Sequence, residues 1–376
     1  MPWKGVTVPD VRFAFVHSVL VCHSPVSAAC RMFGISRKTG YKWLKRYQAS
    51  MPLVDVSKRP RHSPARTPDA LETAILQVRD HHGWGPRKIR AFLITQLRLE
   101  LPSIRTVANI LTRHDRIKPP RTAPQPIQFF ERSECNELWQ CDHKGPLEVE
   151  RRRVFPFAAI DDHSRFAVVL RCCTDLSMAT AWNVLWDAFG DYGLPRSILC
   201  DNAFGSKVPH VPGVSWFESQ LIRLGIRPIH GRPYHPQTQG KVERFNGALE
   251  LELWPKVRRD SIAHFDADLD HWRSQVYNSI RPHESLGDLA PATRWRPSPR
   301  KRPAALPEVE YPSGAMVRKV SSSGDIRWKS YRILAGRGLV GQFVRVEDRN
   351  HEVALFYSWK EIRTIPGTAL RLDRML

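Results

Sequence analysis

Three acidic residues of this chain stand where carboxylates could meet and do chemistry together. Asp142 closes a short β-type run, Asp201 ends an apolar run of strand character, and Glu243 lies one turn into a helical pattern. Three such carboxylates can hold two Mg²⁺ ions about 3.5–4 Å apart, which stabilise the attacking and leaving oxygens of an in-line displacement at phosphorus. Each residue also has a simpler interpretation, because a helical Glu is often solvated and an Asp often ends a strand.

The neighbours of Glu243 favour the chemical interpretation. Lys241, Arg244 and Asn246 lie within three residues of it in the sequence. A carboxylate would repel phosphate in a plain phosphate site, but a divalent cation between the two removes that conflict. The stretch is therefore consistent with a metal-assisted phosphate site at the start of a helix.

The elements that must position these acids alternate between strands and helices. Strands are expected at residues 138–143, 154–161, 166–173, 197–201 and 227–230, and helices at residues 178–191, 215–224 and 240–254. Ligands of α/β sheets collect where loops leave the carboxyl ends of strands, and Asp142 and Asp201 fall at such places. The sequence thus predicts that both aspartates share one edge of a sheet.

A set of motifs carries a resemblance to a known family. They are Trp139-Gln-Cys-Asp142, Ile160-Asp-Asp-His-Ser-Arg165, Cys200-Asp-Asn202, His235-Pro-Gln-Thr-Gln-Gly-Lys-Val-Glu-Arg-Phe-Asn246, Tyr277-Asn278, Arg281-Pro-His283 and Leu286-Gly287. With them the chain resembles the DDE-type transposases of bacterial insertion sequences, whose catalytic core is like that of retroviral integrases. The gap between Asp201 and Glu243 is longer than is usual in that family, and residues 207–215 are expected to hold the extra length as a loop.

The resemblance implies that Asp142, Asp201 and Glu243 are the catalytic and metal-binding triad, with Mg²⁺ or Mn²⁺ as cofactor and two ions per active site. It implies a DNA transposase or integrase, a polynucleotidyl transferase that binds insertion-sequence ends. Such an enzyme cleaves DNA and joins it by strand transfer, with a 3′-OH nucleophile and no covalent enzyme intermediate.

The resemblance also assigns roles around the triad. Lys241 and Arg244 would hold DNA phosphates. Because the triad is already complete, Asp161 and Asp162 are interpreted as a hairpin turn rather than as metal ligands. Residues 134–260 would form an RNase H-like α/β catalytic core, in which three early strands precede the alternation of strands and helices.

The partners implied are double-stranded DNA, both the terminal repeats of the element and the target, and further copies of this chain. Joining two DNA ends in one event requires at least a dimer, so a homo-oligomer on DNA is expected, in the bacterial cytoplasm with the nucleoid. Two alternatives stay open. One is a DNA-binding regulator derived from a transposase but catalytically silent, and the other is an RNase H-like nuclease that does not join DNA.

The charge of the chain points to a polyanionic partner. Its 376 residues carry a net charge of +21 with a pI of about 10.1. The charge is uneven: residues 1–66 contain twelve Lys and Arg against two Asp and Glu, whereas residues 134–260 contain sixteen of each. The predicted core is therefore neutral, and the flanking segments supply the attraction to DNA.

Residues 1–50 are expected to form a helix-turn-helix DNA-binding domain. Gly34-Ile-Ser36 is the turn, and the second helix of such a motif reads bases with its N-terminal residues. The candidates for this contact are Arg37, Lys38, Thr39 and Lys42. The alternative is a basic three-helix surface that binds DNA without reading its sequence.

A second helix-turn-helix domain is expected at residues 67–114. Its helices are predicted at residues 68–81, 87–96 and 104–113, and Ser103 is the expected cap of the third. Arg105, Thr106 and Asn109 are its candidate DNA contacts. Residues 51–66 are a basic linker and residues 115–133 are a second, Pro-rich linker.

The segment after the core is expected to be an amphipathic helix and a Pro/Arg-rich linker, together residues 261–312. Residues 313–376 follow as a small β-barrel, SH3-like by analogy with the family, with strands at residues 315–320, 326–334, 342–346 and 353–357. The fold class expected is thus multidomain, with all-α N-terminal modules, an RNase H-like α/β core and a small C-terminal β-barrel.

Cysteine use and hydropathy exclude several classes of protein. The seven cysteines include no Cys-x-x-Cys pair, so neither a disulfide framework nor a zinc site is expected, and the compartment is predicted to be reducing. No apolar run reaches the length of about 18 residues that a membrane-spanning helix needs, so no membrane partner is expected.

Overall fold

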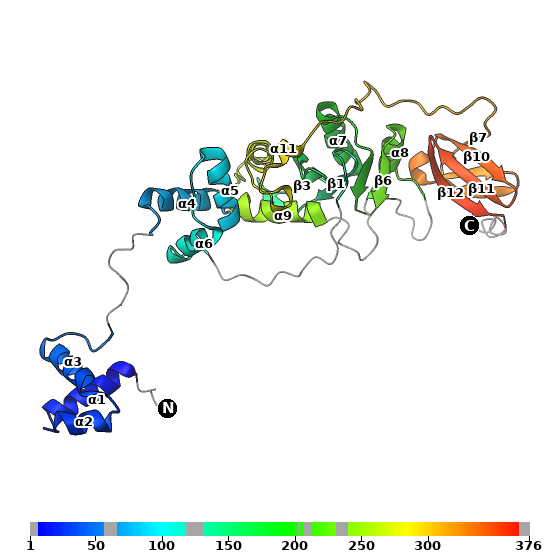
Figure 1. Cartoon of the computed structure of the whole chain (residues 1–376). Helices are drawn as coiled ribbons and strands as arrows, with labels where there is room; N and C mark the ends of the chain where they lie inside the picture. The colour runs from blue at the N-terminus through cyan, green and yellow to red at the C-terminus, as the bar shows by residue number, and fades with distance from the viewer. Residues whose placement is uncertain are drawn as a thin grey trace. The chain divides into compact units, whose positions relative to one another are not determined.

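The computed structural model describes residues 7–55, 66–117, 131–201, 204–205, 213–230 and 240–367. It divides into two compact units, Met1–Arg66 and Thr67–Leu376, and each is described by itself below. Figure 1 shows the helices and strands of both. Among the described residues no helix combines the length and apolar character needed to cross a membrane.

The first unit is a three-helix module. Its helices are α1 (Val8–Leu20), α2 (Val26–Met32) and α3 (Arg37–Gln48). Ser36 caps α3, because its Oγ accepts the backbone N–H of Thr39 at 3.2 Å. Gly40 lies where α3 meets the other helices, and a Cβ there would come within 2.6 Å of the Cys30 Sγ. The glycine that costs α3 some intrinsic stability therefore allows the close approach of the helices.

The second unit begins with another three-helix module, as predicted. Its helices are α4 (Asp69–His82), α5 (Pro86–Leu97) and α6 (Ile104–Arg113). Gly83 ends α4 in the left-handed conformation, at φ +73°, and Ser103 caps α6. The three helices enclose a small apolar core of Ile75, Trp84, Ile89, Leu93, Val107, Ile110 and Leu111.

A six-stranded mixed sheet follows. Its strands are β1 (Trp139–His143), β2 (Leu147–Val149), β3 (Arg152–Asp161), β4 (Ala167–Cys173), β5 (Ser197–Cys200) and β6 (Arg227–His230). The order is β2-β3-β1-β5-β6, with β4 paired to β3. The neighbours β1, β3 and β4 are antiparallel, whereas β5 and β6 continue from β1 in parallel. This arrangement agrees with the predicted core of three early strands and a later alternation with helices.

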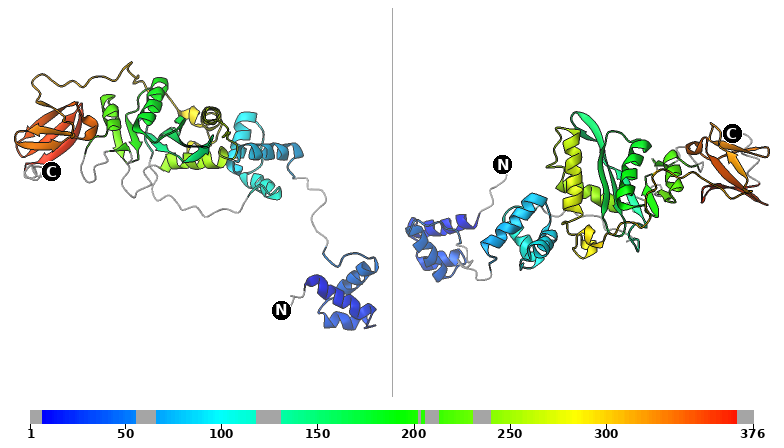
Figure 2. Two further views of the ribbon diagram at one scale, coloured as in Figure 1. Left: turned by 180° about the vertical axis from the view of Figure 1, so that it is seen from behind. Right: turned by 90° about the horizontal axis from the view of Figure 1, so that it is seen from above.

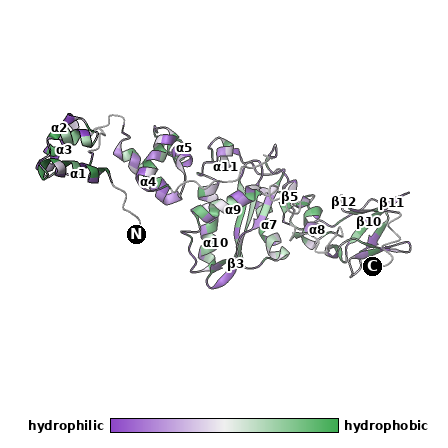
Figure 3. Ribbon diagram, turned by 90° about the horizontal axis from the view of Figure 1, so that it is seen from below, coloured by the Kyte–Doolittle hydropathy of each residue, from purple (hydrophilic) through white to green (hydrophobic). Residues whose placement is uncertain are grey.

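Helices cover both faces of the sheet, which Figure 2 shows in its right-hand view. On one face lie α7 (Met178–Tyr192) and α8 (Trp216–Arg223), and on the other lie α9 (Gly240–Glu252), α10 (Ile262–His271) and the π-helical turn η3 (Trp272–Tyr277). The alternation of strand side chains divides the core in two: Trp139 and Cys141 pack toward α7, while Ala158 and Ile160 pack toward α9. Helix α10 carries both apolar and polar residues, as Figure 3 shows.

The segment after η3, predicted as a Pro/Arg-rich linker, lies against the core at least as far as Arg302. It contains η4 (Glu284–Leu286) and α11 (Pro291–Arg294). The Trp295 ring stacks on Phe166 at a centroid distance of 4.7 Å, and Arg300 donates to the carbonyl oxygens of Pro195 and Leu224. Buried main-chain carbonyls need donors, and this basic segment supplies them. We call residues 291–302 the strap.

The C-terminal segment forms an open sheet rather than the predicted closed barrel. Its elements are β7 (Val317–Lys319), β8 (Asp325–Trp328), β9 (Tyr331–Leu334), η5 (Arg337–Leu339), β10 (Phe343–Arg349), β11 (Glu352–Tyr357) and β12 (Lys360–Pro366). Four strands pair in the order β12-β11-β10-β7, while β8 and β9 form a separate hairpin, so the described strands do not close. The sheet packs on α8, where the Trp359 Nε1 donates to the carbonyl oxygen of Ile222 at 2.8 Å.

Candidate active site

The register of the sheet brings two of the predicted acids to one edge. Gln140 of β1 pairs with Leu199 of the parallel strand β5. Two residues further along each strand stand Asp142 and Asp201. Asp142 is half-buried and Asp201, at the end of β5, is exposed. The register therefore places both aspartates at the same carboxyl edge of the sheet.

Helix α9 brings Glu243 to the same edge. The Asn246 Nδ2 donates to the Asp142 Oδ2 at 3.0 Å, and the Gln140 Oε1 accepts the backbone N–H of Val242 at 3.4 Å. Val242 and Asn246 are one helical turn apart, so the same face of α9 meets β1 twice. Glu243 stands between these two contacts in the sequence and is exposed.

The electrostatics of Asp142 report the proximity of all three acids. Burial, together with the negative charges of Asp201 and Glu243, raises the pKa of Asp142 to about 6, against the hydrogen bond from the His143 backbone. The Asp142 carboxylate is thus repelled by both of the other acids. Among the described residues, no group of three or more His, Cys, Asp or Glu side chains has the arrangement of a preformed metal site.

His143 is a neighbour of the site that the sequence did not single out. Its ring stacks on Phe204, at a centroid distance of 5.6 Å and an interplanar angle of 7°, and burial lowers its pKa to about 4. The imidazole is therefore neutral at pH 7. It packs with Phe157 and Phe204 on the face of β1 opposite to Asp142, and it adds no positive charge there.

Two buried polar residues behind the site were also missed as functional candidates. Gln140 lies two residues before Asp142 on the same face of β1, and Asp162 accepts a hydrogen bond from its Nε2 at 2.7 Å. The spacing of two residues from a predicted ligand is the only signal in the sequence that could have found Gln140. Asp162 was predicted as a turn residue, and it does begin the turn between β3 and β4.

The two predicted phosphate-binding residues of α9 differ in environment. The Lys241 Nζ lies 2.5 Å from the Asp162 Oδ1, and the Lys241 side chain is only 13% exposed. Burial lowers the pKa of Lys241, opposed by the carboxylate of Asp162. Arg244 is exposed in the first part of the helix. The contact of either residue with DNA stays a prediction.

The predicted DNA contacts of the helical modules lie in the first two turns of α3 and α6. Arg37, Lys38 and Lys42 are exposed on α3, whereas Thr39 is half-buried and its hydroxyl lies 2.9 Å from that of Ser36.

On α6, Arg105 and Asn109 are exposed one turn apart. Thr106 is half-buried and its hydroxyl lies 3.0 Å from that of Ser103. Each threonine therefore helps to cap its own helix, while the exposed residues are available to a partner.

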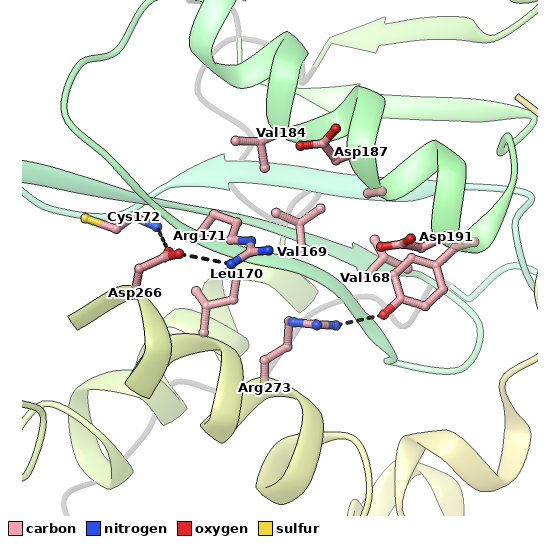
Figure 4. A pocket seen from close by; sticks show the side chains of 12 residues that line it. Val168, Val169, Leu170, Arg171, Cys172, Val184, Asp187, Asp191, Asp266 and Arg273 are labelled. Atoms are coloured by element: carbon pink, nitrogen blue, oxygen red, sulfur yellow. Dashed lines mark hydrogen bonds and ion pairs between the residues drawn. The ribbon is translucent and has the colours of Figure 1, made fainter. Parts of the chain in front are cut away.

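A separate pocket lies between β4, α7 and α10, and Figure 4 shows its side chains. Arg171 pairs with Asp266 at 2.9 Å, and Arg273 donates to the Tyr192 hydroxyl at 3.1 Å. None of the three acids lines this pocket. It is therefore distinct from the acidic edge.

Family models match both predicted parts of the chain. Two descriptions of an integrase core domain match residues 132–236 and 224–291. Two descriptions of a homeodomain-like domain match residues 10–51 and 39–111, which cover the two helical modules.

Similar proteins come from bacterial insertion elements. An uncharacterized 39.2 kDa protein of insertion element IS476 from Xanthomonas euvesicatoria is 26% identical over 301 residues, covering 77% of this chain and 78% of that protein. A putative transposase for insertion sequence element IS5376 from Geobacillus stearothermophilus is 28% identical over 176 residues, 45% of this chain and 43% of its own length.

Solved structures were also matched. The simian T-cell lymphotropic virus intasome in complex with PP2A regulatory subunit B56 gamma contains a chain with 18% identity and a TM-score of 0.38, covering 78% of this chain and 96% of that one. The HTLV-2 integrase catalytic core domain in complex with magnesium gives 17% identity and a TM-score of 0.32, covering 43% and 97%. The family models and the insertion-element relatives support an insertion-sequence transposase with an integrase-like core, that is, a DNA transposase or integrase of the polynucleotidyl transferase class.

Proposed function

We propose that this transposase binds the ends of an insertion sequence and catalyses metal-dependent DNA cleavage and strand transfer. One observation carries the proposal: Asp142, Asp201 and Glu243 come from β1, the end of β5 and α9, and the strand register and the contacts of α9 with β1 bring them to one edge of the sheet. Carboxylates brought together at a cost in repulsion indicate a site whose partner is positive.

The donor set fits a hard divalent cation. The three acids offer only carboxylate oxygens, which are the ligands that Mg²⁺ and Mn²⁺ prefer, and the neutral His143 supplies no competing charge. Asp142, Asp201 and Glu243 would hold the metal, two Mg²⁺ ions per site in our proposal. When bound, such ions act as Lewis acids on the phosphate and favour deprotonation of the attacking hydroxyl.

The reaction needs no covalent bond to the protein. In strand transfer, the 3′-oxygen of the element end forms a P–O bond with the target phosphate, and the bond from that phosphate to the target 3′-oxygen breaks. The phosphodiester count is unchanged, so no external energy source is required. Arg244, and Lys241 beside it, would hold phosphates in line for this displacement.

The flanking modules would bring the DNA. Helices α3 and α6 are proposed to enter the major groove, with Arg37, Lys38, Thr39 and Lys42 on the first and Arg105, Thr106 and Asn109 on the second. Two element ends joined in one event require at least two copies of the chain, so the active form is proposed to be a homo-oligomer assembled on terminal-repeat and target DNA.

A strand-transfer assay tests the proposal. Pre-nicked element ends and a target plasmid are incubated with the full chain and Mg²⁺ at one fixed salt concentration, because affinity that depends on phosphate contacts falls steeply with salt. Wild type is compared with Asp201→Asn and with Asp187→Asn, which removes an exposed carboxylate of α7. Joined product is expected from wild type and from Asp187→Asn. Loss of a metal ligand should remove several kcal/mol of transition-state stabilisation, so about 10³-fold less product is expected from Asp201→Asn.

The other outcomes are equally informative. Chelation of the metal should stop joining while DNA binding continues. Tight binding of cognate ends by wild type without any cleavage would overturn the proposal in favour of a silent regulator. Cleavage without joined product would favour a nuclease.

A further inference from the structure

A buried carboxylate behind the active site connects three distant segments of the chain. Asp162 is completely buried. Its Oδ1 accepts hydrogen bonds from the Gln140 Nε2 at 2.7 Å and from the Lys241 Nζ at 2.5 Å, and its Oδ2 accepts the backbone N–H of Arg132 at 2.7 Å. A buried anion is stable only when such donors compensate its lost hydration. Both oxygens of Asp162 are therefore committed within the protein.

The two side-chain donors to Asp162 each lie two residues before one of the acids in the sequence. Gln140 is two residues from Asp142 on one face of β1, and Lys241 is two residues before Glu243. Gln140 also accepts the backbone N–H of Val242, one of the first helical amides that have no partner inside the helix. The start of α9 is thus held on β1 by a side chain that Asp162 orients.

We propose that Asp162 is a positioning residue that fixes Glu243 relative to Asp142, acting through Gln140 and Lys241. The inference rests on the proposed function, because only a shared metal makes the separation of the two carboxylates matter. The Asn246–Asp142 hydrogen bond holds α9 one turn further along, and the Asp162 network holds its first turn. These two polar attachments of α9 to β1 flank Glu243 in the sequence. Without the Asp162 network, only the Asn246–Asp142 hydrogen bond remains.

Asp161 provides a matched comparison within the same turn. It too is completely buried, but its oxygens accept hydrogen bonds from the backbone N–H and hydroxyl of Ser164 and from the backbone N–H of Asn136. These contacts reach neither β1 beside Asp142 nor α9. Asp161→Asn should therefore remove an equally buried carboxylate charge from the same turn without moving Glu243.

The test is a titration of the full chain with Mn²⁺. The electron paramagnetic resonance signal of the free ion reports how much Mn²⁺ is unbound, so the affinity for the metal is measured independently of catalysis. Wild type and Asp161→Asn should bind Mn²⁺ equally, and Glu243→Gln should bind it weakly. Residues that orient metal ligands typically change metal affinity by about 10–100-fold when replaced, so Asp162→Asn should bind Mn²⁺ at least about 10-fold more weakly.

A second variant keeps the test valid if Asp162→Asn does not fold. Gln140→Met has nearly the same volume and leaves no new charge buried, but it removes the acceptor for the Val242 amide. It should weaken Mn²⁺ binding as Asp162→Asn does, with circular dichroism unchanged from wild type.

The outcomes separate this inference from the proposed function. If wild type fails to bind Mn²⁺, or binds it no better than Glu243→Gln, the proposed metal site itself fails. If those two behave as expected, but Asp162→Asn or a folded Gln140→Met binds Mn²⁺ as tightly as Asp161→Asn, only the positioning role is overturned.

Discussion

Replacement of Glu252 by glutamine should loosen the helical module α4–α6 from the catalytic core. Glu252 is 6% exposed at the end of α9, accepts hydrogen bonds from two side chains and forms an ion pair with a third. Trp84 donates its indole N–H at 3.0 Å, Arg281 donates its Nη2 at 2.8 Å and its Nε at 3.0 Å, and the Lys88 Nζ lies 3.5 Å away. Trp84 and Lys88 belong to the helical module, so one carboxylate joins it to α9 and to Arg281.

The magnitude follows from the burial of the cluster. Removing one partner of a buried ion pair costs about 3–5 kcal/mol, because the remaining charge is left uncompensated. Glutamine keeps the shape and one acceptor, so we expect a loss at the lower end, about 3 kcal/mol. At about 1.4 kcal/mol for each factor of ten, the module should open roughly 10²-fold more often.

Hydrogen exchange of the amides in α4, α5 and α6 measures this opening directly. A matched control is Asp80→Asn, because the Asp80–Arg116 pair is about half exposed and such pairs contribute about 0–1 kcal/mol. Equal exchange in wild type and Glu252→Gln at pH 7 would refute the reasoning.

The effect should also depend on pH in a defined direction. Burial alone would raise the pKa of Glu252, but Arg281, Lys88 and Trp84 hold it below its usual value of 4.5. A carboxyl whose folded pKa is lowered stabilises the protein above its unfolded pKa, and that stabilisation is lost as the pH falls through the folded pKa. The difference between wild type and Glu252→Gln should be full at pH 7 and shrink below about pH 4.5. A difference that stays constant down to pH 3 would contradict the assignment.

The remaining predictions concern the two ends of the chain. Gly338→Ala should detach the C-terminal sheet from α8, because a Cβ at this position would lie 2.1 Å from the Ser215 carbonyl carbon. Limited proteolysis should therefore cleave this variant faster than the control Gly85→Ala, whose Cβ would meet nothing within 4 Å. Arg37→Ala should weaken binding to the element end by about 1–3 kcal/mol and binding to random DNA much less, measured by competition at fixed salt. An equal loss on both DNAs would instead indicate a basic surface that does not read sequence.

Local sequence patterns predicted the parts of the site that depend on the period of single elements. The strand character before Asp142 and Asp201 and the helical spacing after Val242 each follow from residues close in the chain. The parallel register of β1 and β5 then places both aspartates at one edge.

Contacts between distant residues could not be predicted in this way. The hydrogen bond from the Val242 amide to Gln140 spans 102 residues, and no periodicity marks it. The turn between β8 and β9 was missed for a different reason. Lys329 adopts φ +52°, a left-handed conformation that usually calls for Gly or Asn, so residues 326–334 resembled one strand. Closure of the C-terminal sheet likewise depends on which strands pair, which strand propensity does not specify.

The strap has a consequence for the order in which the protein is made. The last of the three acids leaves the ribosome well before residues 291–302, whose carbonyl contacts and Trp295 stacking complete the face of the sheet around α7. Domains fold as units during synthesis, so a nascent chain that already contains Asp142, Asp201 and Glu243 still lacks a finished core. The face of the sheet around α7 is thus complete only after the strap has been translated.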